Sequence, residues 1–271
     1  MAKKIFEPDN PKPFKVSRSK IENFIRCKAC FWMDRVKGIN FPGMPGFNLN
    51  SATDSLMKKD FDKYRELQKP HPFMIRNGLE HLVPFKYFEF EQWTQARKFG
   101  LRTIHKPTNL LIGGGLDDVW HDRSTDQIFM VEYKSTSTIH KPITLEGNWK
   151  KGYKRQIDIY QWILRQNGFD VSDMSYFVYV NADASVEDGY LEDKKDKANM
   201  IFDVQLIEYV GDDSWVEDVL FEIKDVLHQK TCPKHATSGF GYKGDKECEN
   251  AHLFKAMEDH YLALFEEGMF E

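Results

Sequence analysis

The segment GGGLDDVWHDRSTDQIFMVEYK, residues 113–134, decides the expected fold. Two apolar runs, 110–121 and 127–133, flank a polar turn, and this pattern predicts an antiparallel hairpin. Side chains alternate between the two faces of a strand, so Glu132 and Lys134 are expected to point the same way. The sequence therefore predicts a cluster of charged groups at one end of the hairpin.

Asp117 lies on the first predicted strand, within reach of Glu132 and Lys134 on the second. Two carboxylates can bind a hard divalent cation, and a neighbouring lysine can orient an attacking water and offset charge on a phosphate. These groups meet the requirements of metal-assisted phosphodiester hydrolysis. Acids and lysines also occur on any exposed strand, so the short Glu-x-Lys pattern is not specific by itself.

The composition describes an ordinary globular chain. Its 271 residues are 41% hydrophobic and 30% charged, with a formal net charge of −4. No apolar run has membrane-spanning length and no signal-peptide segment opens the chain, so we expect a cytoplasmic protein that does not contact membranes. The net charge does not attract nucleic acid, and a polyanion site would need a local basic patch.

The apolar periodicity predicts helices and strands around the hairpin. A helical stripe runs from about residue 19 to 37, and a second helix over 51–68 would turn Lys58, Lys59 and Lys63 outward. Further expected elements are a helix over 150–167, strands over 174–180 and 200–209, and helices over 214–229 and 251–267.

This order of elements predicts an α/β (α+β) fold with a mixed central β-sheet flanked by helices. We expect a single domain over residues 1–271. Within it, residues 1–100 would form a mainly helical N-terminal lobe, residues 101–210 the catalytic core, and residues 211–271 a C-terminal helical segment.

Gln156 and Tyr160 lie four residues apart on the predicted helix after the hairpin, so they share one face. They could form a hydrogen-bonding clamp near the site or organise a nucleic-acid substrate. Both residue types also occur in ordinary helix packing.

Basic residues gather near the start of the same helix. Together with Trp149 and Tyr153 they could grip a nucleic-acid strand by phosphate contacts and base stacking, or they could simply form a solvated helix start. The basic residues are Lys141, Lys150, Lys151, Lys154 and Arg155.

The order Asp117, Glu132-Tyr133-Lys134 and Gln156 to Tyr160 resembles the RecB-type nucleases of the PD-(D/E)XK superfamily, including the CRISPR-associated RecB-like exonucleases. Their motifs run Gly-x-x-Asp, (Asp/Glu)-x-Lys and Gln-x-x-x-Tyr. Residues 17–27 are also similar to the first helix of that family. The resemblance implies a restriction-endonuclease-like core, Mg²⁺ or Mn²⁺ held by Asp117, Glu132 and the Tyr133 carbonyl, and cleavage of single- or double-stranded DNA, often exonucleolytic.

The segment before the hairpin departs from this family. RecB-type members usually carry a metal-binding histidine on a preceding helix, where this chain offers Asp54. Asp54 could be a hard oxygen ligand, or a solvated or capping residue at a helix start. His81 is an alternative for which we expect a surface role.

Some members of the family also hold an iron–sulfur cluster, with one cysteine near the first helix and three near the C-terminus. Cys27 matches the first position, but Ala251 stands where a Cys-x-x-Cys beginning at Cys248 would have its second thiol. With Cys30 and Cys232, these thiols could hold an iron–sulfur cluster or tetrahedral zinc, or could be ordinary buried cysteines.

The leading hypothesis is a metal-dependent deoxyribonuclease, a phosphodiester hydrolase acting as an exonuclease in DNA processing, repair or recombination, with protein partners in a DNA-processing complex. The alternative, motivated by the missing histidine, is a catalytically silent nucleic-acid-binding or partner-binding module on the same fold.

Overall fold

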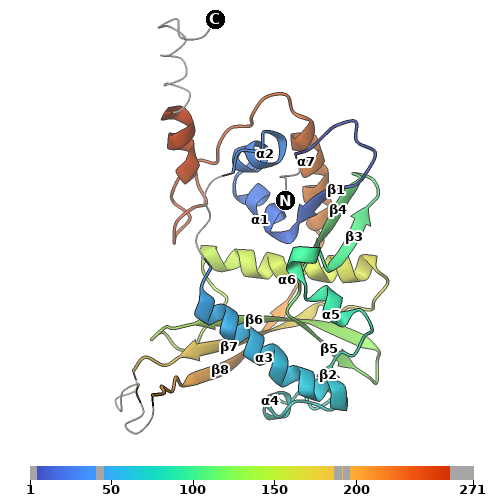
Figure 1. Ribbon diagram of the computed structural model, residues 1–271, viewed down its shortest axis with the longest axis vertical. Helices are drawn as coiled ribbons and strands as arrows, with labels where there is room; N and C mark the ends of the chain where they lie inside the picture. Colours follow the sequence, from blue (N-terminus) through green and yellow to red (C-terminus); the bar gives the residue numbers. More distant parts are fainter. Residues whose placement is uncertain (1–4, 41–45, 186–190, 192–195, 257–271) are drawn as a thin grey trace, which may run out of the picture.

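The computed structural model describes residues 5–40, 46–185, 191 and 196–256, and its strands form two mixed sheets flanked by helices (Figure 1). This confirms the α/β (α+β) class, although two sheets replace the single central sheet that we predicted. Of the predicted C-terminal helix, residues 251–256 are helical and residues 257–267 lie outside the described residues. No helix in the described ranges is long and apolar enough to cross a membrane.

The larger sheet contains the predicted hairpin. Its strand order is β2 (Leu82–Pro84), β5 (Asp118–Asp122), β6 (Gln127–Thr136), β7 (Met174–Ala182) and β8 (Phe202–Val210). β5 and β6 pair antiparallel, with Asp118 opposite Val131. β6 and β7 run parallel, so the chain must cross over between them, and helix α6 (Lys151–Gln166) makes this crossover.

The first strand of the predicted hairpin is two strands, and the earlier one, β4 (Leu110–Gly114), belongs to the smaller sheet. Its order is β1 (Phe14–Ser17), β4 and β3 (Leu101–His105), with β1 parallel to β4. The prediction of one strand over residues 110–121 was therefore wrong, because the chain leaves this sheet after Gly114 and enters the other at Asp118.

Consecutive glycines allow this break. A Cβ atom on Gly114 would lie 2.6 Å from the Tyr160 hydroxyl oxygen, and one on Gly115 would lie 2.5 Å from the backbone nitrogen of Ala96. Neither position has room for a side chain. The Tyr160 hydroxyl donates a 2.7 Å hydrogen bond to the Gly115 carbonyl and so fixes the bend.

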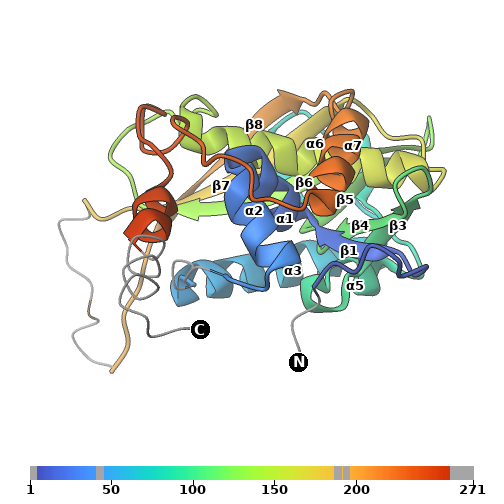
Figure 2. The same cartoon turned by 90° about the horizontal axis from the view of Figure 1, so that it is seen from above.

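Two helices replace the single N-terminal helix that we predicted. α1 (Arg18–Arg26) ends and α2 (Lys28–Val36) begins at Cys27, whose backbone is extended with φ −159°. The resulting turn lets Phe24 and Phe31 meet edge to face, with ring centroids 5.2 Å apart. Helix α7 (Val216–His228) packs against both α1 and α2 (Figure 2).

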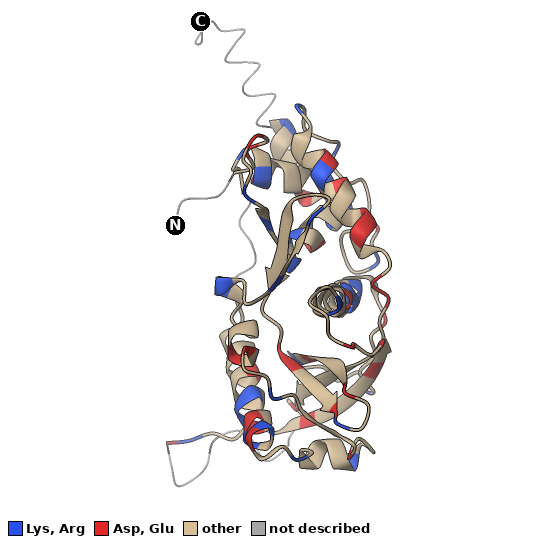
Figure 3. Cartoon of the chain, turned by 90° about the vertical axis from the view of Figure 1, so that its right-hand side faces the viewer, with Lys and Arg blue, Asp and Glu red and all other residues tan. Residues whose placement is uncertain are grey.

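Helices cover both faces of the larger sheet. α3 (Asn48–Leu67) packs against β6 and β2, while α6 lies between the two sheets and is viewed end-on in Figure 3. The β6 side chains alternate accordingly: Val131 and Tyr133 belong to the apolar cluster with Phe61 of α3, and Met130 belongs to the cluster with α6.

Short helical turns complete the chain: α4 (Pro72–Arg76), α5 (Phe90–Trp93), η1 (Ala96–Lys98) and η2 (Asn148–Lys150).

A buried ion pair joins α3 to the hairpin. The Arg65 guanidinium donates to Asp118 at 2.6 Å and to the Phe85 carbonyl at 2.7 Å. The Tyr133 hydroxyl donates to the other Asp118 oxygen at 2.5 Å. Asp118 is 1% exposed and Arg65 6%, so each charge depends on the other inside the core.

Arg65→Met tests this network. Removing the guanidinium leaves the Asp118 carboxylate buried without its cation, and we expect the free energy of unfolding to fall by about 3–5 kcal/mol in urea titrations. Lys63→Met, on the exposed side of the same helix, should cost less than about 1 kcal/mol. Equal losses in the two variants would contradict the assigned role of Arg65.

Candidate active site

Glu132 and Lys134 lie on the face of β6 that points toward α6. The Lys134 ammonium donates to Glu132 Oε1 at 2.5 Å and lies 3.5 Å from the Gln156 side-chain oxygen. It also lies 4.3 Å from the centroid of the Tyr153 ring, in a cation–π contact. The predicted common face of Glu132 and Lys134 is thus observed, and Gln156 of α6 lies beside it.

Asp117 joins this group from the break between β4 and β5. Its Oδ2 accepts a 3.0 Å hydrogen bond from the backbone N–H of Tyr133, and its Oδ1 accepts one of 3.1 Å from Lys58. The carboxylate therefore lies next to the β6 backbone between Glu132 and Lys134. Tyr133, whose backbone carbonyl we expect to contribute to a metal site, also supplies its N–H to Asp117.

Lys58 is a residue of this site that sequence reasoning misplaced. We predicted that it faces outward, but its ammonium bridges Asp54 at 3.0 Å and Asp117 at 3.1 Å. Asp54 and Lys58 are one turn apart on α3, the helix whose Arg65 contacts Asp118 at the start of β5. Asp54 therefore does lie near Asp117, as the metal hypothesis requires, with a lysine between them. His81 is exposed, as expected.

Burial and crowding of carboxylates govern the electrostatics. Burial, together with the negative charge of Asp117, raises the pKa of Glu132 to about 7, although Lys134 and Arg18 oppose the shift. Burial and the charge of Asp117 also raise the pKa of Asp54. Glu132 is 2% exposed, and its Oε2 has no hydrogen-bond partner among the described residues. That oxygen is a buried acceptor available for a further partner.

Tyr160 organises the site from one side. Its hydroxyl donates a hydrogen bond to the carbonyl of Gly115, two residues before Asp117. This bond fixes the backbone that leads into Asp117. Burial raises the pKa of Tyr160 to about 12, and it stays protonated as a donor. Arg18, at the start of α1, interacts with Tyr160 and favours the ionised form of Glu132. Sequence reasoning did not single out Arg18.

The predicted basic patch at the start of α6 is only partly available. The Lys150 ammonium lies 4.9 Å from the Trp149 ring centroid, Lys154 lies 3.5 Å from Glu146, and Lys151 is exposed. Lys150 ends η2 (Asn148–Lys150), and Lys151 and Lys154 lie on the first turn of α6, just before Gln156.

Arg155 has an internal partner instead. Its guanidinium makes two hydrogen bonds to Glu22, of 2.7 and 2.6 Å, and thereby joins α6 to α1. A bidentate pair of this kind fixes geometry. Arg155, which we predicted as a nucleic-acid contact, thus positions the helix that carries Gln156 and Tyr160.

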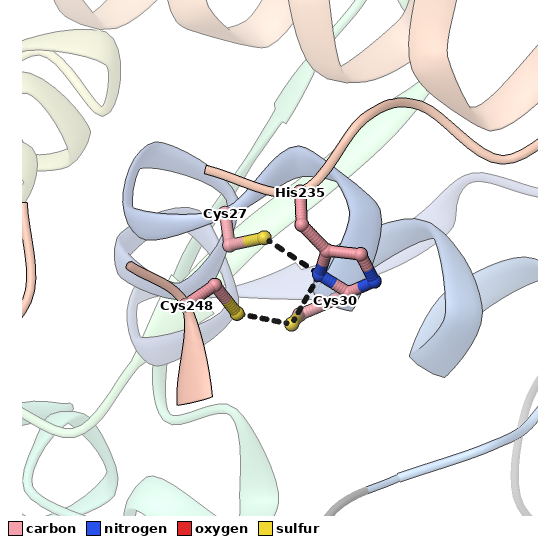
Figure 4. Close-up of side chains that lie close together, drawn as sticks. All are labelled: Cys27, Cys30, His235 and Cys248. Atoms are coloured by element: carbon pink, nitrogen blue, oxygen red, sulfur yellow. Dashed lines mark hydrogen bonds between the residues drawn. The ribbon is translucent and has the colours of Figure 1, made fainter. Parts of the chain in front are cut away.

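A second cluster lies at the α1–α2 junction (Figure 4). Cys27, Cys30 and Cys248, three of the four predicted cluster residues, come together there with His235. Cys232, the fourth, is exposed and is not part of the group. His235 was missed; among these four donors, Cys27-x-x-Cys30 is the pair with a spacing common among zinc ligands.

The two clusters differ in how closely their donor atoms approach. In the cysteine cluster the three sulfurs and the histidine nitrogen all lie within 4.8 Å of one another. Among the described residues, Asp54, Asp117 and Glu132 do not form such a group; Lys58 bridges Asp54 and Asp117, and Lys134 pairs with Glu132.

No protein-family model matches the chain, and no curated protein matches its sequence. The function is therefore inferred from the side chains of the site and their geometry. They lie together at one end of the larger sheet: Asp117 before β5, Glu132 and Lys134 on β6, and Gln156 and Tyr160 on α6.

Glu132→Gln tests the raised pKa of this carboxyl. The folded protein keeps the Glu132 proton up to about pH 7, whereas the unfolded chain loses it near pH 4.5. Ionisation of Glu132 therefore lowers the free energy of unfolding of the wild type as the pH rises from about 4.5 to about 7. The variant lacks this titration. Its free energy of unfolding relative to wild type should therefore increase between about pH 5 and about pH 8, by about 1.4 kcal/mol for each tenfold difference in proton affinity between the folded and unfolded states.

Urea titrations at both pH values, without added divalent cations, measure this difference. The exposed Glu208 offers a matched control, and Glu208→Gln should change the free energy of unfolding by less than about 0.5 kcal/mol. A pH-independent difference for Glu132→Gln would show that Glu132 is already ionised at the lower pH.

Proposed function

We propose that this chain is a divalent-metal-dependent nuclease that hydrolyses phosphodiester bonds in DNA, built on a restriction-endonuclease-like core. The observation that carries the proposal is the convergence of Asp117, Glu132 and Lys134 at one end of the larger sheet, with Gln156 against Lys134. Separate elements supply these groups, and the hairpin's alternation and the glycine break bring them together.

The donors present suit a hard cation. Asp117 and Glu132 offer carboxylate oxygens, which Mg²⁺ and Mn²⁺ prefer, and Glu132 Oε2 is buried without a partner among the described residues. Asp54 could complete the set once Lys58 moves aside. When bound, the metal would supply charge stabilisation at the phosphate and at the leaving oxygen.

Lys134 is proposed to orient the attacking water. Its ammonium is held between Glu132 Oε1 and the Gln156 oxygen, above the Tyr153 ring, so its position is fixed before substrate binds. A fixed cation beside the phosphate offsets the charge that develops there without having to reorganise. Gln156 acts as a positioning residue for Lys134, and Tyr160 as one for Asp117.

DNA is proposed to approach from the start of α6. Lys150, Lys151 and Lys154 can contact phosphates there, and the half-exposed Trp149 offers a ring for base stacking. A groove lined by the N-terminal part of α3 and by Ser135 and Ser137 lies at the end of β6. A strand could therefore pass over the site from the basic side toward these hydroxyls.

Asp117→Asn and Lys134→Met test the activity. Each should lower Mg²⁺- or Mn²⁺-dependent cleavage of end-labelled DNA by at least on the order of 10²-fold, because each removes a group that acts on the transition state. Glu208→Gln and Lys63→Met are exposed matched controls and should cleave like wild type. Thermal melting of all four proteins checks that they are folded.

Single-stranded DNA, duplex DNA and RNA in the same assay identify the substrate, and products labelled at either end separate exonuclease from endonuclease. Cleavage at the wild-type rate by Asp117→Asn or Lys134→Met would refute this site.

The Lys58 bridge gives specific support to a second possibility, a silent nucleic-acid-binding or partner-binding module. In such a protein, the lysine would replace a metal permanently as the counter-charge of Asp54 and Asp117. In a nuclease, Lys58 would instead compete with the cation for these carboxylates.

Lys58→Met separates the two. Removing the ammonium frees both carboxylates, and in a nuclease the Mn²⁺ concentration that gives half-maximal thermal stabilisation should fall by roughly 10-fold. Lys63→Met should leave it unchanged. If neither wild type nor Lys58→Met is stabilised by Mn²⁺, the silent module is the better description.

A further inference from the structure

The cluster of sulfur and nitrogen donors near the α1–α2 junction joins two distant parts of the chain. Cys27 and Cys30 come from the junction itself, at the N-terminus of α2, whereas His235 and Cys248 come from the segment after α7 (Figure 4). More than 200 residues separate the two pairs in sequence. The side chains point toward a common centre, with Cys27 and Cys248 buried.

The separations between these donors are those of ligands around a single ion. Zinc bonds of about 2.3 Å to sulfur and about 2.0 Å to nitrogen, arranged tetrahedrally, place sulfur and nitrogen roughly 3.5 Å apart and two sulfurs roughly 3.8 Å apart. His235 Nδ1 lies 3.5 Å from Cys27 Sγ and 3.7 Å from Cys30 Sγ, and the sulfurs of Cys30 and Cys248 are 3.3 Å apart.

Neighbouring N–H groups are directed at the sulfurs. The backbone N–H of Ala236 donates to Cys27 Sγ at 3.5 Å, and the side-chain amide of Asn250 donates to Cys30 Sγ at 3.3 Å. Donors of this kind orient metal-bound thiolates and stabilise their charge. The N-terminus of α2 adds a partial positive charge beside Cys27 and Cys30.

We propose that these four side chains bind one tetrahedral zinc ion, a Cys₃His site that fastens residues 231–250 to the α1–α2 junction. No carboxylate belongs to the donor set, which favours zinc over the hard cations expected at the sheet. The set is also closed, with four protein ligands, as in structural zinc sites.

An iron–sulfur cluster, which the family resemblance implied, does not fit these residues. A cluster of several iron atoms is wider than one ion and needs protein ligands further apart than the separations found here, and such clusters are usually held by four thiolates. The fourth thiol, Cys232, is exposed outside the group, and His235 takes its place.

The site has a structural task that the surrounding packing does not perform. Residues 229–248 contain no helix or strand longer than a single bridge. The buried members of the apolar cluster that holds them are the small residues Cys27, Ala29 and Cys248, and among the described residues Phe240 is the one aromatic residue packed against it. Little apolar area is buried there, so a metal is a reasonable source of the free energy that orders this segment.

Metal analysis of the full-length protein, purified without added metal and with oxygen excluded, tests this inference independently of nuclease activity. We expect on the order of one zinc per chain and no visible absorbance. His235→Ala should lower the zinc content at least about 10-fold and lower the melting temperature, because three ligands leave the site open. His235→Cys restores a four-ligand set and should retain zinc.

Cys232→Ser is the matched control and should bind zinc like wild type, since this exposed cysteine of the same segment lies outside the group. If His235→Ala does not fold, the wild-type protein still answers the question. Of its four thiols, one should react at once with a thiol reagent, and the other three only as zinc is released.

Three results would overturn the inference. Iron and sulfide with visible absorbance would identify an iron–sulfur cluster. Loss of two thiols without metal would identify a disulfide between the neighbouring sulfurs of Cys30 and Cys248. Four freely reactive thiols in metal-free, folded protein would show that the cluster binds nothing.

Discussion

The adjacent aspartates Asp117 and Asp118 lie in opposite environments, and the architecture depends on this division. Asp118 begins β5 and faces the α3 side of the sheet, where Arg65 and the Tyr133 hydroxyl satisfy its buried charge. Asp117 precedes the strand and is partly exposed, and it accepts hydrogen bonds from the Tyr133 N–H and from Lys58 of the same helix. One residue of sequence thus separates a structural carboxylate from one in the proposed active site.

The glycine break makes this division possible. If the strand beginning at Leu110 continued unbroken, the smaller sheet would retain Asp117. Because the chain bends at Gly114 and Gly115 under the Tyr160 hydroxyl, the hairpin enters the larger sheet beside β6. The arrangement also explains why the Gln-x-x-x-Tyr residues belong to the site: Gln156 fixes Lys134, and Tyr160 fixes the approach to Asp117.

The charges of the site are balanced internally. Asp54, Asp117 and Glu132 are crowded and partly or fully buried, which raises the pKa of Asp54 and Glu132. Lys58 and Lys134 offset this repulsion. A divalent cation that enters must replace contacts already made by Lys58, so the apparent metal affinity should depend on this lysine as well as on the carboxylates.

Much of the site follows from local periodicity. The alternation of β6 predicts the shared face of Glu132 and Lys134, and the four-residue helical spacing predicts that of Gln156 and Tyr160. Lys58 escaped prediction because a lysine at the edge of an amphipathic helix can extend its long side chain in either direction, and only tertiary contacts decide which.

Other features depend on contacts between distant segments. The split of the first hairpin strand depends on the close approach of Gly114 to Tyr160 and of Gly115 to Ala96, which a glycine run suggests but does not locate. His235 lies 205 residues from Cys30, so no spacing rule joins them. The Arg155–Glu22 pair is similarly remote, and a basic run gives no sign that one member has an internal partner.

Asp117 and Glu132 are proposed to bind the divalent metal that the nuclease reaction needs. Calorimetric titration of wild type, Asp117→Asn and Glu208→Gln with Mn²⁺ measures this binding. We expect a binding event in wild type and in Glu208→Gln that disappears in Asp117→Asn. Identical binding in all three proteins, or none in wild type, would contradict it.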